Sequence, residues 1–310
     1  MTNRIRGRAD KRLSFRNNGT FTIVQFTDLH MHHEEPLNEE TVQLMSRILD
    51  AEKPDLVVYT GDMVGGPRCP DRAPLLRQAL EPVLSRQIPW AAIFGNHDAE
   101  QDTTKEALLA VQLESSWCLT EPGPAEINGL GNYVLRIHDA KEERLAAALY
   151  LFDTGDKAPS DIGGEAWVQS DQIQWYTQQS KLLEAERGAR VPALSFIHIP
   201  LPEYEQAWDA PGRIGHKGEK VCCPDVNSGF LAAMVERGDV QAVFCGHDHS
   251  NDYCGKVHGI YLCYGHVTGC ETRNPPEGMH GARVIRLNQG GKSFNTWVRL
   301  ADGSVSEHRL

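Results

Sequence analysis

Five apolar segments of this chain each end abruptly at side chains that commonly bind metal ions, and this pattern restricts the fold more than any other feature. The segments FTIVQF, DLVVYT, WAAIF, ALSFI and VQAVFC are followed by Asp28 and His30, by Asp62, by Asn96, His97 and Asp98, by His198, and by His247 and His249. Turn preferences favour glycine, asparagine and aspartate after a strand, but not histidine. In α/β sheets the carboxyl ends of strands share one edge, where distant residues meet. The pattern therefore predicts one site built from five strand ends.

The order of the segments predicts an α/β protein. Helical spacing of apolar residues is found at 39–51, 74–87, 103–114, 170–186 and 228–238, with Asn38, Thr103 and Ser228 placed as N-terminal caps. After residue 250, apolar segments follow one another with no helical pattern between them. Strands alternating with helices, then strands alone, predict a mixed sheet or a pair of sheets. An Asn18-Gly19 turn predicts a hairpin of residues 12–16 and 20–26.

Chain length and net charge restrict the domain organisation and the possible partners. Residues 15–310 are expected to form a single domain, preceded by a flexible basic tail at 1–14, with loops at 119–132, 155–166, 202–227 and 270–281. The chain shows no apolar stretch of membrane-spanning length and no secretory signal, which predicts a cytoplasmic protein without membrane contact. A net charge of −11 disfavours nucleic acid as a partner. The sequence leaves open the oligomeric state and whether Cys254 and Cys263 pair.

The donor atoms indicate the kind of ion. Carboxylates, an amide and imidazoles without a cysteine form a nitrogen and oxygen site, which suits Mn, Fe, Zn or Co better than a thiolate-bound structural zinc. The set exceeds the needs of one tetrahedral ion. Two ions about 3.5–4 Å apart, bridged by a carboxylate, would use it, and such pairs are common in phosphoryl transfer.

The first cluster of candidate donors contains Asp28, His30, His32 and His33, and their positions along the chain predict which of them face the site. Residues two apart in an extended chain face the same way, so Asp28 and His30 are expected to point together into the site. His32 is expected at the rim, and His33 in solvent.

The motifs DLH, GD, GNHD, FIH and GHDH, in this order over residues 28–249, resemble the calcineurin-like metallophosphoesterases. Longer phrases such as EKPDLVVYTGD resemble the atypical purple-acid-phosphatase-like branch of plants and fungi. His30 stands where true purple acid phosphatases carry glycine, and GDMVGG lacks their tyrosine, so a purple tyrosinate centre is not expected. The resemblance implies a two-sheet mixed β-sandwich flanked by helices in four layers.

The resemblance also implies residue roles. Asp28, His30 and His249 would hold one ion, Asn96, His198 and His247 the second, and Asp62 would bridge two transition-metal ions, Mn, Fe or Zn. A metal-activated hydroxide would attack phosphorus in line, while His97, oriented by Asp98, assists the leaving group. The substrate would be a small phosphoester or a phosphoprotein. His266 and Arg68 are weaker candidates for substrate contacts.

The sequence leaves two other functions open. One is a hydrolase of cyclic nucleotides or other small phosphodiesters, because nothing in the motifs separates diesters from monoesters. The other is a noncatalytic interaction module on the same fold. Loss of a ligand or of the proton-donating histidine would be expected in such a module, whereas every motif position is filled here.

Overall fold

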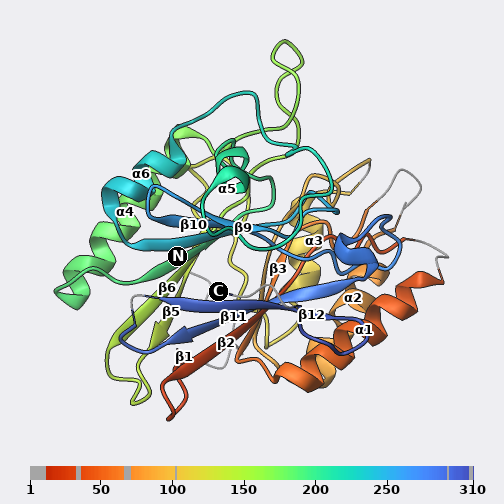
Figure 1. The fold of residues 1–310 in the computed structure, drawn as a ribbon, viewed down its shortest axis with the longest axis horizontal. Helices are drawn as coiled ribbons and strands as arrows, with labels where there is room; N and C mark the ends of the chain where they lie inside the picture. The colour runs from red at the N-terminus through yellow and green to blue at the C-terminus, as the bar shows by residue number, and fades with distance from the viewer. Residues whose placement is uncertain (1–11, 33–35, 66–70, 102, 292, 307–309) are drawn as a thin grey trace.

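The structure, a computed structural model, describes residues 12–32, 36–65, 71–101, 103–291, 293–306 and 310. Two β-sheets lie at its centre with helices on either side (Figure 1). Within the described residues the larger sheet has seven strands, in the order β1 (Leu13–Ser14), β5 (Tyr133–His138), β6 (Leu145–Leu151), β7 (Ala193–Phe196), β8 (Val240–Cys245), β10 (Ile260–Tyr264) and β9 (Cys254–Val257). The smaller has five, in the order β12 (Phe294–Leu300), β11 (Gly281–Asn288), β2 (Thr20–Phe26), β3 (Leu56–Thr60) and β4 (Trp90–Ile93). The predicted α/β pair of mixed sheets is confirmed.

The strands that lead to the predicted donors run parallel within each sheet. β2, β3 and β4 pair in parallel in the smaller sheet, and β6, β7 and β8 in the larger one. Parallel neighbours require crossover connections, which the helices between them provide. Parallel pairing places the carboxyl ends of the strands at the same edge of each sheet, and this is where the donors follow.

Four layers result because each sheet is apolar on both faces. Ile23 packs in the core between the sheets, while its neighbour Val24 packs against helices on the outer face of the smaller sheet. The inner core also holds Phe196 and Phe244, which stack with ring centroids 5.5 Å apart. Burial of each such side chain stabilises the fold by about 1.5–3 kcal/mol. Burial on both faces explains why these strands are continuous apolar runs in the sequence.

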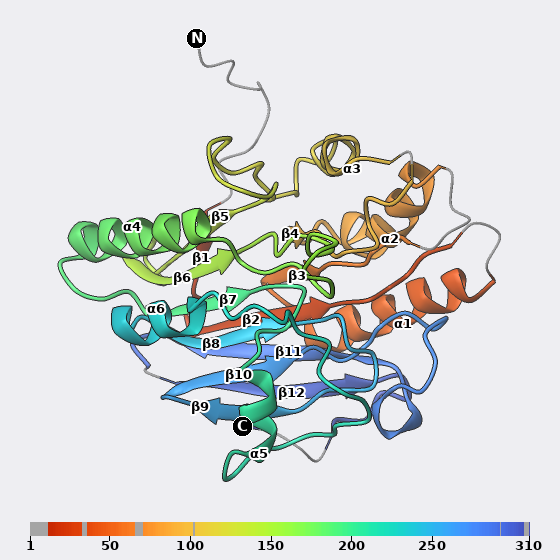
Figure 2. The ribbon, with the colours of Figure 1, turned by 90° about the horizontal axis from the view of Figure 1, so that it is seen from above.

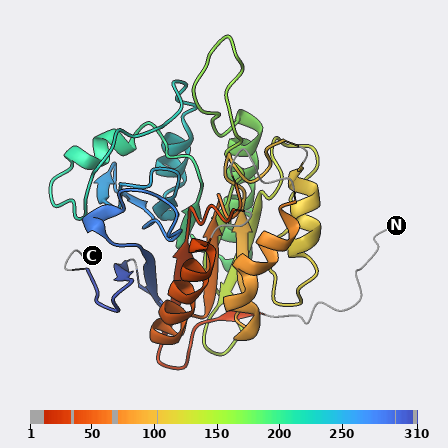
Figure 3. The same cartoon turned by 90° about the vertical axis from the view of Figure 1, so that its right-hand side faces the viewer.

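Helices cover the outer faces in two groups. α1 (Leu37–Glu52), α2 (Ala73–Ser85) and α3 (Lys105–Gln112) pack on the smaller sheet side by side, whereas α4 (Ser170–Arg187) and α6 (Phe230–Arg237) cover the larger sheet (Figures 2 and 3). α5 (Tyr204–Asp209) and a 3-10 turn at Pro276–Gly278 lie within expected loops. No helix of the described residues is both long and apolar enough to cross a lipid bilayer.

Three predicted helix caps are wrong by one or two residues. α3 is capped by Thr104, whose side chain accepts from the Ala107 amide, and not by Thr103. α6 begins after Gly229, which adopts a left-handed φ of 77°, and not after Ser228. Asn38 lies inside α1, where its side-chain amide donates to the His32 carbonyl at 2.6 Å. Caps depend on local backbone angles that periodicity does not specify.

The prediction of an N-terminal hairpin is also wrong. The turn exists, since the Gly19 amide donates to the Arg16 carbonyl at 2.8 Å. However, β1 pairs in parallel with β5 of the larger sheet, so the chain passes from one sheet to the other at this turn. Leu13 and Ser14, expected in the flexible tail, therefore belong to a sheet, while residues 1–11 lie outside the described residues.

The hairpin of β9 and β10 answers the question about the two cysteines. Cys254 and Cys263 are directly opposite each other in the antiparallel register. Both are buried free thiols.

Candidate metal centre

The predicted donors lie just beyond the strand ends at the edge where the two sheets meet. Asp28 follows β2, Asp62 follows β3 and Asn96 follows β4, all in the smaller sheet. His198 follows β7, and His247 and His249 follow β8, in the larger sheet. The histidine and aspartate side chains among them, with His30, form two clusters, and within each cluster the ligand atoms lie within 4.8 Å of one another.

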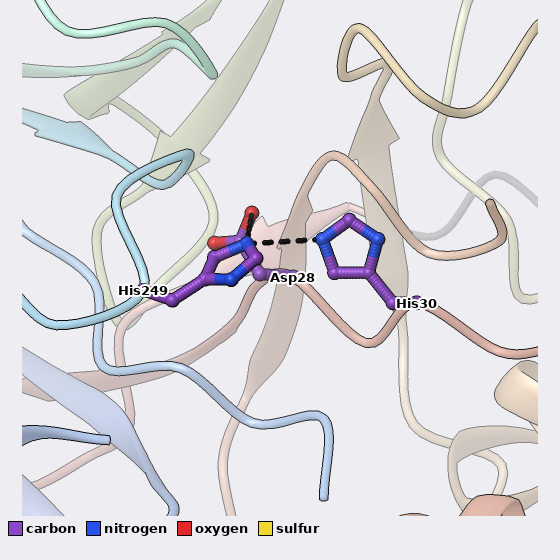
Figure 4. A group of neighbouring side chains, drawn as sticks. All are labelled: Asp28, His30 and His249. Carbon is purple, nitrogen blue, oxygen red and sulfur yellow. Dashed lines mark hydrogen bonds and ion pairs between the residues drawn. The ribbon is translucent and has the colours of Figure 1, made fainter. Parts of the chain in front are cut away.

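The first group contains Asp28, His30 and His249 (Figure 4). Nε2 of His30 lies 3.0 Å from Nε2 of His249, and the latter lies 3.7 Å from Oδ1 of Asp28. Thr27 donates its hydroxyl to Oδ2 of Asp28 at 2.7 Å, and the His247 amide donates to the same carboxylate at 3.1 Å. The carboxylate is thereby held in place by neighbours from both sheets.

The second group contains Asp62, His198 and His247, with Asn96 beside them. Nδ1 of His198 donates to the Thr60 carbonyl at 2.7 Å, so its Nε2 faces the group. This Nε2 lies 3.3 Å from Oδ2 of Asp62, 3.3 Å from Nδ1 of His247 and 3.0 Å from Oδ1 of Asn96. Four donor atoms from both sheets converge here.

The backbone at these residues is unusual. Among the described residues other than glycine, eleven have positive φ, and four of them are Asp28, His30, Asp62 and His247. Left-handed backbone costs such residues on the order of 1–3 kcal/mol, and it concentrates at functional sites. Asp28 and His30 lie in one group, but the parity argument for this is wrong, because the chain is not extended there. Each residue instead turns its side chain by a left-handed φ, of 55° and 46°.

Two motif glycines make room for the carboxylates. A Cβ on Gly95 would lie 2.2 Å from Oδ1 of Asp62, and one on Gly246 would lie 2.8 Å from Oδ2 of Asp28. Real Cβ atoms do not come this close, so a side chain at either position would displace a predicted ligand.

Two of the histidine rings are neutral and ready to bind a metal ion, whereas a third holds a proton. Burial lowers the pKa of His30 and of His247 to about 3, which leaves neutral rings with a lone pair to donate. Burial acts to lower the pKa of His198 as well, but the charge of Asp62 outweighs it and raises that pKa to about 10. A proton and a metal ion are thus alternative partners for His198, and binding of an ion here would release the proton.

The donor set fits metal ions by its geometry. Ring nitrogens of His30 and His249 face each other at 3.0 Å, and those of His198 and His247 at 3.3 Å. Two lone pairs at such distances repel, so each pair requires a proton or a cation between its nitrogens. Imidazole, carboxylate and amide donors are those that Mn, Fe and Zn accept.

The structure does not support the role predicted for Asp98. Its two oxygens accept four backbone amides, those of Asp62, Met63, Val64 and Gly95, at 2.8–3.1 Å. Asp98 therefore fastens the loops after β3 and β4 to each other. The ring of His97 is instead bonded at Nδ1 to Glu100, at 2.6 Å.

The prediction that His266 contacts the substrate is wrong. The ring is buried, and both of its nitrogens are hydrogen-bonded, one to Asp252 at 3.0 Å and the other to the Met279 carbonyl at 2.8 Å. Arg68 and His33 lie outside the described residues. His32 is partly exposed and lies 3.6 Å from Glu271, away from the two donor groups.

Sequence reasoning missed Glu100 and Arg72. Glu100 lies three residues after His97 in GNHDAE, a spacing that allows a side-chain contact and could have indicated it. Arg72 precedes α2 in a segment with no motif, and nothing in the sequence separates it from a surface arginine.

Comparisons with known proteins agree with this geometry. Adjoining donor groups of this kind are found in phosphatases, nucleases and other enzymes that use two metal ions. Residues 21–251 match the model of the family described as calcineurin-like phosphoesterase, and the chain belongs to that family.

The relatives include proteins with and without a named activity. The chain is 34% identical to "Probable inactive purple acid phosphatase 29" of Arabidopsis thaliana, over 96% of this chain and 86% of that protein. It is 31% identical to "Phosphatase DCR2" of Saccharomyces cerevisiae, over 96% of this chain but 56% of that longer protein. Among solved structures, a dimetal phosphatase from Danio rerio has a TM-score of 0.60 at 14% identity, covering 90% of this chain and 95% of that one, which shows the shared fold.

Proposed function

We propose that this protein is a dinuclear metal-dependent hydrolase of phosphoric esters. The observation that carries the proposal is the position of Asp62, which belongs to the second donor group and also lies next to the first. Its Oδ2 lies 3.6 Å from Nε2 of His30 in the first group and 3.3 Å from Nε2 of His198 in the second. A carboxylate shared in this way is what a pair of adjoining ions requires.

Each residue has a role in this proposal. Asp28, His30 and His249 would hold one ion, Asn96, His198 and His247 would hold the other, and Asp62 would be shared by both. When bound, the ion pair supplies Lewis acidity and lowers the pKa of coordinated water. The metal is Mn, Fe or Zn by donor chemistry.

His97 is the proton donor of the proposed reaction. Its ring lies beside the first group, with its centroid 5.5 Å from that of His30, and its amide donates to Oδ1 of Asp62 at 2.8 Å. A partly exposed imidazole at this place is accessible to the oxygen of a leaving group, and general acid catalysis of this kind contributes about 10²–10⁴-fold. The substrate is a small phosphoester or a phosphoprotein.

The word "inactive" in the names of three Arabidopsis thaliana relatives favours one competing function, a noncatalytic binding module. Against it, both donor groups, the shared carboxylate and His97 are present in this chain. A module without turnover has no need to retain left-handed backbone at four donor residues.

The test is a substrate panel on metal-loaded protein. Chain loaded with Mn²⁺ or Zn²⁺ is assayed on aryl and alkyl phosphomonoesters, linear and cyclic phosphodiesters, and a phosphopeptide. Turnover of at least one class, lost in His97→Gln with the ion content unchanged, supports the proposal. Protein that binds two ions per chain and hydrolyses none of these substrates overturns it in favour of the binding module.

A further inference from the structure

The ring of His97 is held by a carboxylate outside the GNHD motif. Nδ1 of His97 lies 2.6 Å from Oε1 of Glu100, three residues along the chain. A carboxylate that accepts from Nδ1 fixes the tautomer and leaves Nε2 as the atom that meets the substrate. Asp98 is excluded from this position because its oxygens accept backbone amides of other residues.

Glu100 is itself fixed by a buried arginine. The guanidinium of Arg72 lies 3.3 Å from Oε2 of Glu100 through NH2, and its NH1 donates to the carbonyls of His97 and Asp98. The side chain of Arg72 is fully buried, and a buried cation without such partners would be strongly destabilising. One arginine thus ties both the backbone of His97 and the carboxylate on its ring.

Gly65 lies close to Cβ of His97. A Cβ at Gly65 would lie 2.9 Å from Cβ of His97 and 3.5 Å from Nδ1 of His30. A side chain at position 65 would therefore displace His97, whose ring is held by Glu100 at Nδ1.

The charge of Glu100 suits this role. Burial acts to raise the pKa of Glu100, but the hydrogen bonds and charges of His97 and Arg72 lower it overall. Glu100 is therefore ionised at neutral pH, and a carboxylate stabilises an adjacent imidazolium more than a neutral acceptor does.

We propose that Glu100, held by Arg72, is the positioning residue that presents Nε2 of His97 to the leaving oxygen. The inference rests on the proposed function. Water forms the new bond to phosphorus as the bond to the leaving oxygen breaks. The leaving oxygen takes a proton from Nε2 of His97, and the proton lost by water returns to Nε2, so protons balance over one turnover. Glu100 stays ionised throughout.

The experiment compares Glu100→Gln with the matched control Glu114→Gln. Glu114 pairs with Arg77 on the surface, so the control also removes one arginine-paired carboxylate but leaves the metal centre untouched. Glu100→Gln is expected to lower kcat by about 10–100-fold with KM within about twofold. The loss should be larger for phenyl phosphate than for p-nitrophenyl phosphate, because the poorer leaving group needs the proton more. Glu100→Asp should restore part of kcat, and Glu114→Gln should not differ from wild type.

A second measurement does not depend on turnover. In protein labelled with ¹⁵N-histidine, the His97 resonances are identified by their loss in His97→Gln. Wild type is expected to carry a proton on Nδ1, and Glu100→Ala to shift the ring toward the Nε2-protonated tautomer. Wild-type His97 without a proton on Nδ1, or a Glu100→Gln loss equal for both esters, overturns the inference. Absence of any turnover in wild type with Nδ1 protonated removes the proposed function but leaves the positioning contact standing.

Discussion

The two donor groups differ in how firmly the protein holds them. In the second group, His198 is fully buried and its Nδ1 is fixed by a backbone carbonyl of the other sheet. In the first group, the side chains of His30 and His249 are 12% and 31% exposed. Preorganised ligands lose less entropy when an ion binds. We therefore expect the second group to bind its ion more tightly and the first to exchange its ion with solvent more readily.

The largest expected effect comes from removing the carboxylate that joins the groups. Loss of a residue that only hydrogen-bonds to a metal ligand lowers activity by roughly 10–100-fold. Asp62→Asn should lower kcat/KM by more than this, because it removes a negative charge that both ions would share. Asparagine tolerates the left-handed φ of 51° at this position, so the fold should remain. Steady-state kinetics and ion counting by atomic spectrometry check this. Activity within tenfold of wild type, with two ions retained, would show that Asp62 is not the shared ligand.

The next prediction compares stability and ion binding between the two donor groups. His198→Ala removes a buried, hydrogen-bonded ring and should destabilise the protein by about 2–4 kcal/mol, whereas His249→Ala should cost less than about 1 kcal/mol. After dialysis, His249→Ala should retain about one tightly bound ion per chain and His198→Ala should retain less. Urea unfolding in chelator and ion analysis provide the two readouts. The comparison fails if the two variants lose stability and ions equally.

A smaller effect tests the strain in the first group. His30 has a φ of 46°, which glycine adopts without cost. His30→Gly should weaken binding of the ion in the first group. In chelator it should nevertheless raise the free energy of unfolding by up to about 1 kcal/mol. The relief of backbone strain, on the order of 1–3 kcal/mol, is partly offset by the packing that the ring loses. A fall of more than about 1 kcal/mol would mean that strain at the site is not stored as inferred.

The smallest effect serves as the reference for the strain. Lys53 ends α1 in a left-handed conformation with φ of 47° and precedes β3, whereas the donor Asp62 follows the other end of that strand. Lys53→Gly should raise the free energy of unfolding by about 0.5–1 kcal/mol, because glycine is favoured at this cap. Ion content and turnover should stay at the wild-type level. A change in either would show that the site responds to distant stability changes.

Much of the fold and of the donor set was predictable from the sequence for one physical reason. Strands buried on both faces are continuous apolar runs, and their ends are visible as abrupt polar residues such as Asp62 and His198. Parallel pairing then brings those ends together, whatever their separation along the chain.

What the sequence could not predict depends on backbone angles and on competition between neighbours. The left-handed turns at Asp28 and His30 carry only a weak signal in residue type, because the enrichment of Asp and His in this conformation does not say which residue of a loop adopts it. Both Asp98 and Glu100 are close enough in sequence to reach His97, and only the path of the loop decides which one does. His266 follows a strand as the candidate donors do, but both of its ring nitrogens are occupied, by Asp252 and by the Met279 carbonyl.

The most direct test of a shared two-ion centre is a stepwise metal titration. Chelator-treated protein is titrated with Mn²⁺ while bound ion and hydrolysis of p-nitrophenyl phosphate are followed together, and the titration is repeated with Zn²⁺. Two ions per chain should bind in two phases, with turnover appearing only in the second, weaker phase, and His249→Ala should abolish that phase alone. Saturation at one ion, or full turnover before the second ion binds, would contradict the dinuclear centre.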